Sequence, residues 1–289
     1  MRVFLAGATG AIGRLLLPLL LTAGHQVVAC SRSEEGTRAL REQGAEAVRL
    51  DVFDRTAVER AMAAAAPDAV IHQLTALSGF APGPVQALAE NARIRREGTR
   101  NLVDAAHQAK VRRIVAQSIS WAYQGGDTPA TETTPLDPGT EQPRATTVGG
   151  VRALEEAAAE LPEHVVLRYG TLYGPGTWFA KGALMAERLH RGELAASEAV
   201  SSFLHVEDAA RAALAALDWP SGTVNVVDDE PAPARLWVPA LAAAVGAPTP
   251  PAVAGRAAWE RGADGALART AHGWRPTRAS WRQGFAALA

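Results

Sequence analysis

A glycine-rich turn, Gly-Ala-Thr-Gly-Ala-Ile-Gly at residues 7–13, decides how the start of this chain folds. The apolar residues 3–6 before it predict a buried strand, and residues 11–23 predict a helix that ends at Gly24. Glycines at this spacing permit a tight turn, close approach of the backbone to a pyrophosphate, and close packing of helix on strand. Because the helix N-terminus would face the phosphates, the turn predicts a dinucleotide site.

Outward from this turn, short apolar strands alternate with helical stretches. Strands are predicted at residues 27–30, 47–50, 69–72, 113–116, 165–168, 203–206 and 224–227, and helices at 55–66, 85–110, 147–160, 183–190 and 207–217. This alternation predicts an α/β fold, a Rossmann-type doubly wound parallel sheet with helices on both faces. A smaller, mostly helical C-terminal region would bind substrate. The expected domains are a core of residues 1–170, to which 203–228 return, and a cap of 171–202 and 229–289.

Composition narrows the classes of function. The 289 residues carry 29 Lys+Arg against 30 Asp+Glu, so no basic surface for nucleic acid or an anionic membrane is expected. The single cysteine, Cys30, excludes an internal disulfide and argues against a Cys-based metal site. The apolar stretch 15–21 is too short to span a bilayer. We therefore expect a cytoplasmic monomer or homodimer, with a small-molecule substrate and no metal.

The end of the second predicted strand indicates which dinucleotide is bound. NAD enzymes usually carry an acid here for the ribose 2′-hydroxyl, whereas an arginine suits a 2′-phosphate. This chain has Ser31, Arg32 and Ser33 at that point, which favours NADPH/NADP. The alternative is that Arg32 is merely a solvated arginine and that Glu34 or Glu35 takes the ribose.

The motifs along nearly the whole chain resemble the extended short-chain dehydrogenase/reductase family, of the NAD-dependent epimerase/dehydratase kind. The turn glycines, the segment Val70–Ala76, the stretch Glu97–Leu102 and the C-terminal Gly273–Pro276 all match its patterns. The resemblance implies that Asp51 touches the adenine and that Leu167–Gly176 lies beside the nicotinamide. The expected cofactor-binding residues are Gly7, Thr9, Gly10, Ala11, Ile12, Gly13, Ser31, Arg32, Asp51, Val52, Leu74, Thr75, Ala76, Gln117, Tyr169, Gly170 and Leu172.

The acid–base pair of that family, Tyr-x-x-x-Lys, does not occur in this sequence. The only tyrosines are Tyr123, Tyr169 and Tyr173, and the only lysines are Lys110 and Lys181, so no pair has the required spacing. On the helix that should carry it, Thr147 and Val151, or with a shift of one residue Val148 and Arg152, stand at the two positions. A further position, where the family often has Asn, holds Arg95.

The catalytic candidates that remain are Ser118, Thr147 and His205. Ser118 or Ser120, at the end of the fifth strand, can hydrogen-bond a substrate oxygen, and the alternative is a serine that satisfies the strand end. Thr147 is a far weaker acid than tyrosine, and His205 or water would deliver a proton. Tyr169 and Tyr173 can offer a hydroxyl or simply pack. We expect aromatic side chains to line a pocket for a flat ligand: Trp121, Tyr123, Trp178 and Phe179.

The sequence therefore predicts an NADPH-dependent ketoreductase that works without a catalytic tyrosine. An activated carbonyl conjugated with a phenol can accept hydride and leave the charge as a phenolate, so a polycyclic aromatic polyketide or quinone is the expected substrate. Atypical reductases of antibiotic biosynthesis offer the analogy. Two alternatives stay open: a non-catalytic NADP-binding sensor or scaffold, and a nucleotide-sugar epimerase/dehydratase, which usually needs the tyrosine.

Overall fold

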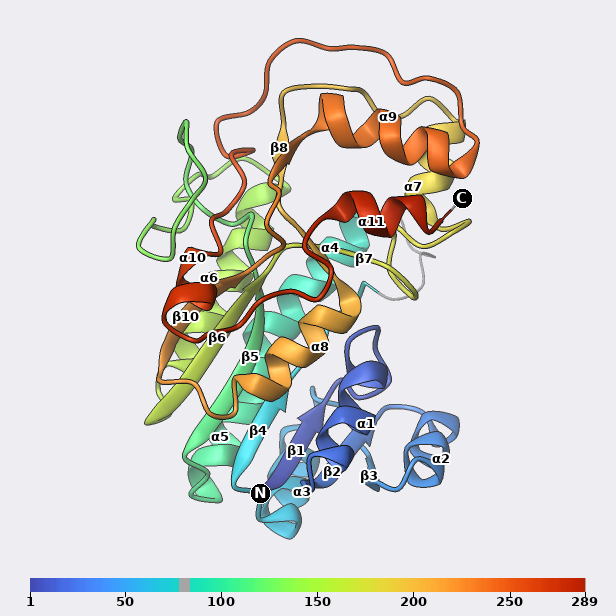
Figure 1. Cartoon of the computed structure of the whole chain (residues 1–289). Helices are drawn as coiled ribbons and strands as arrows, with labels where there is room; N and C mark the ends of the chain where they lie inside the picture. Colours follow the sequence, from blue (N-terminus) through green and yellow to red (C-terminus); the bar gives the residue numbers. More distant parts are fainter. Residues whose placement is uncertain (78–83, 289) are drawn as a thin grey trace. The chain divides into compact units, whose positions relative to one another are not determined.

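The computed structural model describes residues 1–77 and 84–288. It confirms the predicted Rossmann-type sheet, whose seven strands run in the order β10-β6-β5-β4-β1-β2-β3 (Figure 1). β1 lies between β2 and β4 and is parallel to both, with Val3 opposite Val27 and Ala69. The strands of the sheet are β1 (Arg2–Ala6), β2 (Gln26–Ser31), β3 (Glu46–Arg49), β4 (Ala69–His72), β5 (Arg113–Ile119), β6 (Glu163–Tyr169) and β10 (Gly222–Val226).

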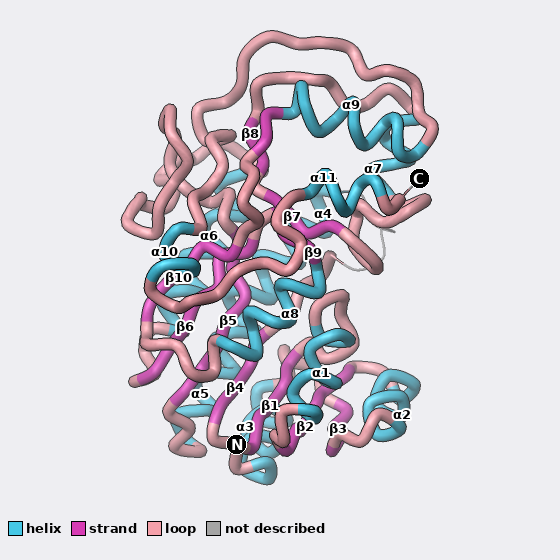
Figure 2. The backbone as a smooth tube through the Cα atoms, viewed as in Figure 1, coloured by secondary structure: helices cyan, strands magenta, loops and turns pink. Residues whose placement is uncertain are grey.

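Helices connect these strands and depart from the sequence prediction at two places (Figure 2). The helix α2 was not predicted; it begins after Ser33, whose hydroxyl accepts a hydrogen bond from Gly36 N. The long helix predicted at 85–110 is interrupted by one π-helical turn, η1. The helical segments of this part are α1 (Gly13–Thr22), α2 (Glu34–Glu42), α3 (Arg55–Ala65), α4 (Pro84–Arg93), η1 (Ile94–Gly98), α5 (Thr99–Gln108) and α6 (Arg144–Ala158).

The C-terminal half adds short elements. Prolines at 248, 250 and 251 interrupt the predicted helical tail, so α9 and α10 are separated by an extended stretch. α9 ends at Gly246, which adopts the left-handed conformation at φ +68°. The elements are β7 (Thr171–Tyr173), α7 (Leu184–His190), β8 (Val200–Ser201), β9 (Phe203–His205), α8 (Val206–Ala215), β11 (Ala232–Pro233), α9 (Ala234–Val245), α10 (Ala266–Thr270) and α11 (Trp281–Ala286).

The chain folds into two compact units, and its backbone passes between them several times. The first unit comprises residues 1–118, 140–167 and 210–223, and the second comprises 119–139, 168–209 and 224–289. The domain boundaries expected from the sequence stay a prediction, because they separate a cofactor-binding core from a substrate-binding cap. Each unit is described by itself below.

The core of the first unit fills the layer between the sheet and three helices. α3, α5 and α6 pack against one another on this face. Strand residues such as Val28, Val70 and Ile114 meet Met62 of α3 and Leu154 of α6 in one buried cluster. Since successive strand residues point to opposite faces, His72, two positions after Val70 on β4, and Ser118, four positions after Ile114 on β5, point into this same layer.

The core of the second unit is aromatic. Phe203 makes edge contacts with Trp237 and Phe285, at ring-centroid distances of 5.4 and 5.5 Å. Phe179 stacks on Phe285, so it belongs to this core, and Tyr123 is likewise only 1% exposed. Of the four aromatic residues expected to line a pocket, these two are therefore packing residues.

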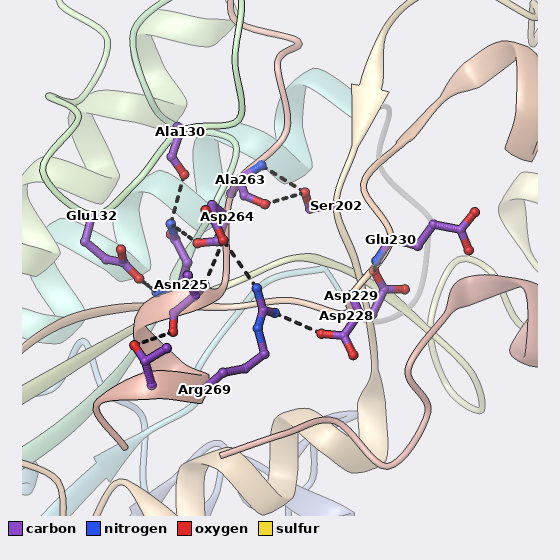
Figure 3. A network of polar contacts seen from close by, with 12 residues as sticks. Ala130, Glu132, Ser202, Asn225, Asp228, Asp229, Glu230, Ala263, Asp264 and Arg269 are labelled. Carbon is purple, nitrogen blue, oxygen red and sulfur yellow. Dashed lines mark hydrogen bonds and ion pairs between the residues drawn. The ribbon is translucent and has the colours of Figure 1, made fainter. Parts of the chain in front are cut away.

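A polar network joins distant segments of the second unit (Figure 3). The Asn225 amide donates to the carbonyl oxygens of Ala130 and Asp264 at 3.2 and 3.0 Å, and its oxygen accepts from the Tyr123 hydroxyl. Arg269 bridges the carboxylates of Asp229 and Asp264 at 2.9 and 3.3 Å. These contacts satisfy buried polar groups and hold loops that contain little secondary structure.

None of the helices in the described part of the chain combines the length and the apolar composition that a membrane span requires.

Candidate functional site

The glycine turn between β1 and α1 is built as its sequence predicts. Gly7 adopts φ +92°, which favours glycine, and its carbonyl oxygen accepts a hydrogen bond from Gly10 N at 3.1 Å. A Cβ on Gly13 would lie 2.1 Å from that same oxygen. The N-cap of α1, Ile12, offers no side-chain acceptor to the first-turn N–H groups. These donors and the helix dipole therefore suit a phosphate.

A cavity of about 770 Å³, which includes the space at its open mouth, lies against this turn. Nine of the predicted cofactor residues line it, all in the first unit: Gly7, Thr9, Gly10, Ser31, Arg32, Asp51, Val52, Leu74 and Thr75.

Other predicted cofactor residues lie elsewhere. Ala11, Ile12 and Gly13 form the start of α1, and Ala76 N donates to the Asn91 side chain at 3.1 Å. Gln117 is buried on β5. Tyr169, Gly170 and Leu172 belong to the second unit, so their role toward the cofactor stays a prediction.

The cavity also contains residues that were not predicted to bind the cofactor: Ala6, Cys30, Leu50, Phe53, Gln73, Ile94 and Leu102. Gln73 is the informative one: it is 4% exposed, and neither polar atom of its amide has a hydrogen-bond partner among residues 1–77 and 84–288. A buried amide left unsatisfied costs about 1–3 kcal/mol. Gln73 therefore fits a cavity that holds a ligand with hydrogen-bonding groups. Its position directly before Leu74 was the available signal.

The carboxyl end of β2 is basic. Arg32 is exposed beside the cavity, and its carbonyl oxygen accepts a hydrogen bond from Arg49 Nε at 3.3 Å. Arg49, at the end of β3, was not singled out from the sequence. Two arginines at the point where the ribose of a dinucleotide would lie favour an additional anionic group there.

A buried polar layer lies at the carboxyl ends of β4 and β5, on the side that α5 and α6 cover. The Ser118 hydroxyl donates to Glu155 of α6 at 2.6 Å. His72 accepts a hydrogen bond from Leu74 N on Nδ1, and its Nε2 lies 2.9 Å from the Thr99 hydroxyl. Burial, reinforced by the nearby Arg95, lowers the pKa of His72 to about 4, so its ring is neutral.

The helix α6 reads Arg-Ala-Thr-Thr-Val-Gly-Gly-Val-Arg-Ala-Leu-Glu-Glu-Ala-Ala and so contains neither tyrosine nor lysine. Thr147 on this helix is 4% exposed. Close packing of α6 on α4 depends on Gly150, since a Cβ there would lie 2.9 Å from Ala92 Cα. Ser118 and Thr147 both belong to the first unit, and their catalytic roles stay predictions.

The three tyrosines all lie in the second unit and all use their hydroxyls internally. Tyr169 donates to Ala209 O at 3.1 Å, and Tyr173 donates to Ser280 O at 3.4 Å. Burial raises the pKa of Tyr123 to about 12 and also raises the pKa of Tyr173. Neither Tyr169 nor Tyr173 therefore presents an uncommitted hydroxyl.

His205 is 4% exposed and packs edge-on against the Tyr173 ring, with centroids 5.0 Å apart. Its Nδ1 accepts from Glu207 N at 3.3 Å, so the neutral ring carries its proton on Nε2. Burial, together with Arg278, lowers the pKa of His205. A role as proton donor stays a prediction, and it would have to use a neutral imidazole at neutral pH.

Among the described residues, no group of three or more His, Cys, Asp or Glu side chains is arranged to hold a metal ion. The carboxyl ends of the parallel strands, the glycine turn and the cavity define a Rossmann-type dinucleotide-binding protein.

The comparisons identify the family. The pattern of the NAD dependent epimerase/dehydratase family matches residues 3–227, and the chain belongs to that family. Over 313 aligned positions it is 44% identical to a Streptomyces protein named 3-diazoavenalumate denitrifying reductase, covering 99% of both chains.

Solved structures agree on the fold. A Thermus thermophilus UDP-glucose 4-epimerase in complex with NAD is 27% identical, with a TM-score of 0.76 over 99% of this chain and 97% of that one. A Thermotoga maritima UDP-glucose 4-epimerase with UDP-glucose, 22% identical, gives a TM-score of 0.77 over 100% of this chain and 97% of that one.

Proposed function

We propose that this chain is an NADPH-dependent reductase whose substrate is an aromatic acid carrying a diazo group, which the reaction replaces with hydrogen. The observation that most directly supports this proposal is that α6 contains no tyrosine or lysine. The 44% identity to a reductase named for removing nitrogen from a diazo compound supports the substrate class.

Reduction of the diazonium form takes up no net proton. A bound nicotinamide dinucleotide would supply a hydride, which would form an N–H bond at the terminal nitrogen. The C–N and N–H bonds would then break, nitrogen would leave as N₂, and the proton released from nitrogen would form the new C–H bond. The cofactor is oxidised by two electrons and the substrate is reduced by two, with no net proton taken up. A site that lost its acid therefore remains competent for this reaction, whereas a general acid ordinarily contributes roughly 100- to 10,000-fold.

The residues of the first unit have distinct roles in this proposal. The glycine turn binds the pyrophosphate, Gln73 hydrogen-bonds the dinucleotide, and Arg32 with Arg49 binds a 2′-phosphate. Because the Ser118 proton points to Glu155, the Ser118 oxygen presents lone pairs, which suit an electron-poor group better than an oxyanion. Thr147 then shapes the site without donating a proton.

An activated carbonyl on a polycyclic aromatic polyketide or quinone is the second candidate, because a phenolate product also dispenses with an enzymic acid. In that reaction His205 or water would supply the proton. The two candidates share the cofactor and differ in product: one releases nitrogen and the other yields an alcohol.

The test is to supply NADPH and a diazotised aminohydroxybenzoate labelled with heavy nitrogen. We expect labelled N₂, measured by mass spectrometry, in equal amount to the NADPH oxidised. Oxidation of NADPH in the presence of an aromatic ketone or quinone, but not of the diazo acid, would favour the carbonyl reductase. Tight NADPH binding with no turnover of either substrate would favour the sensor or scaffold.

Because NADPH reduces diazonium compounds slowly without a catalyst, the rate is compared with that of the Gly13→Ala variant at the same protein concentration. That variant should bind the dinucleotide poorly, because a Cβ on Gly13 would displace the turn, and should leave only the background rate. An NADP⁺-dependent epimerisation of a nucleotide sugar by the unaltered protein would overturn the proposal altogether.

A further inference from the structure

Arg95 is a buried cation in a distorted part of a helix. It is 3% exposed and lies in the π-helical turn η1, between α4 and α5. π-Helical turns are rare and occur frequently at functional sites. The preceding residue, Ile94, lines the dinucleotide cavity, so η1 forms part of the wall of the site.

The polar groups around Arg95 are already paired with one another. Ser118 donates to Glu155, and His72 is held by Leu74 N and the Thr99 hydroxyl. Arg95 lies close enough to His72 and Glu155 to influence or be influenced by their charge. Within residues 1–77 and 84–288, however, the Arg95 guanidinium has no hydrogen bond and no ion pair, and its nitrogens keep a small contact with solvent.

Such a group is costly for the protein. Removing most of a guanidinium from water carries a penalty of several kcal/mol, and the charge of the nearby Glu155 offsets it without forming an ion pair with Arg95. Burial lowers the pKa of Arg95 to about 10, and the Glu155 carboxylate opposes this shift. The guanidinium therefore stays charged at neutral pH, and an anionic ligand would restore the missing interactions.

We propose that Arg95 binds the carboxylate of the substrate. This inference rests on the proposed function, in which the substrate is an aromatic acid. The planar guanidinium fork matches a carboxylate in a bidentate geometry. Its position beside His72 and Glu155 is at the carboxyl ends of β4 and β5, where ligands of open α/β sheets bind.

The anions of the cofactor have other partners. The pyrophosphate would lie at the glycine turn, and a 2′-phosphate would lie at Arg32, at the end of β2. Arg95 does not line the cavity that holds these two places. The remaining anion of the reacting pair is the substrate's own carboxylate.

The experiment measures binding of 4-hydroxycinnamate and its methyl ester to the NADP⁺-loaded protein by calorimetry. We expect the carboxylate to bind roughly 10- to 100-fold more tightly than the ester, as for a hydrogen bond to a charged group. Arg95→Met should remove this preference, and Arg95→Lys should retain part of it. Arg96→Met, at the exposed neighbouring arginine, should leave it unchanged.

Thermal unfolding without ligand provides the second readout. An arginine that is buried only for a ligand destabilises the empty protein, so Arg95→Met should raise the melting temperature by about 2–5 °C. A fall in melting temperature would mark Arg95 as a structural residue and overturn the proposal. So would an unchanged preference for the carboxylate in Arg95→Met, or a loss confined to dinucleotide affinity.

These outcomes are separate from those of the proposed function, because the probes are not turned over. A strong, Arg95-dependent preference for the carboxylate, with no release of nitrogen from any diazo compound, would refute the proposed reaction and leave the carboxylate site standing. Nitrogen release with no preference between acid and ester would do the reverse.

Discussion

The glycine turn and the polar layer at the ends of β4 and β5 lie in the same unit but are built differently. The turn consists of backbone: its shape follows from Gly7 at φ +92° and from a Gly13 that has no room for a Cβ. The polar layer consists of side chains from elements far apart in the sequence, such as Ser118 and Glu155, 37 residues apart. A backbone site tolerates few residues and keeps its motif, whereas a side-chain site can change its chemistry while the fold persists.

The largest effect should come from the backbone site. A Cβ on Gly13 would lie 2.1 Å from Gly7 O and 2.7 Å from Ala8 Cα, so Gly13→Ala must displace the turn. We expect strain of about 1–3 kcal/mol and roughly 100-fold weaker dinucleotide binding, measured by NADPH fluorescence. The control is Gly149→Ala on α6, where a Cβ meets nothing within 4 Å. Equal losses in the two variants would mean that the turn does not hold the cofactor.

The polar layer should make the stability of the folded protein depend on pH. The pKa of His72 is lowered from 6.5 to about 4, so the unfolded chain binds more protons than the folded one between these values. The free energy of unfolding should therefore fall as the pH drops from 6.5 to 4, by about 3 kcal/mol from this group. His72→Gln should flatten the curve obtained by urea denaturation. A variant with the same slope as the unaltered protein would show that other groups control acid unfolding.

The sequence predicted the turn and the alternation of strands with helices, because glycine spacing and apolar runs are local signals. It did not predict that Ser118 donates to Glu155, since the partner of a serine depends on which helix covers the strand. Nor did it predict the π-helical turn at Arg95: periodicity over 85–110 is compatible with one continuous helix. Gln73 and Arg49 were likewise not predicted as site residues, because only the folded chain shows that Gln73 lines the cavity and that Arg49 contacts the end of β2.

Arg32 lies at the end of β2, beside the glycine turn, and its role can be tested by comparing the binding of NADPH and NADH. If Arg32 binds a 2′-phosphate, Arg32→Ala should weaken NADPH roughly 10- to 100-fold and leave NADH unchanged, because only one of them carries that group. Titration with both dinucleotides gives the ratio. Arg38→Ala is the matched control, since Arg38 is exposed on α2 and makes only a long ion pair with Glu42, at 3.9 Å. Equal weakening of the two cofactors by Arg32→Ala would remove the 2′-phosphate assignment.

The smallest effect is expected where the family places its acid. Thr147 is buried on α6, and valine keeps its branched shape and removes only the hydroxyl, so Thr147→Val should still fold, at a cost of about 1 kcal/mol. If hydride transfer needs no proton from the protein, kcat/KM for a diazo acid should change by less than roughly threefold, against the 100- to 10,000-fold typical of a lost general acid. Steady-state kinetics on that acid and on an aromatic ketone distinguishes the two chemistries, because only the ketone must gain a proton. A large loss of kcat/KM on the ketone alone would show that Thr147 donates a proton to carbonyl substrates. A large loss on both substrates would show that the polar layer still contains a catalytic acid, and it would then keep the chemistry of its family as the glycine turn does.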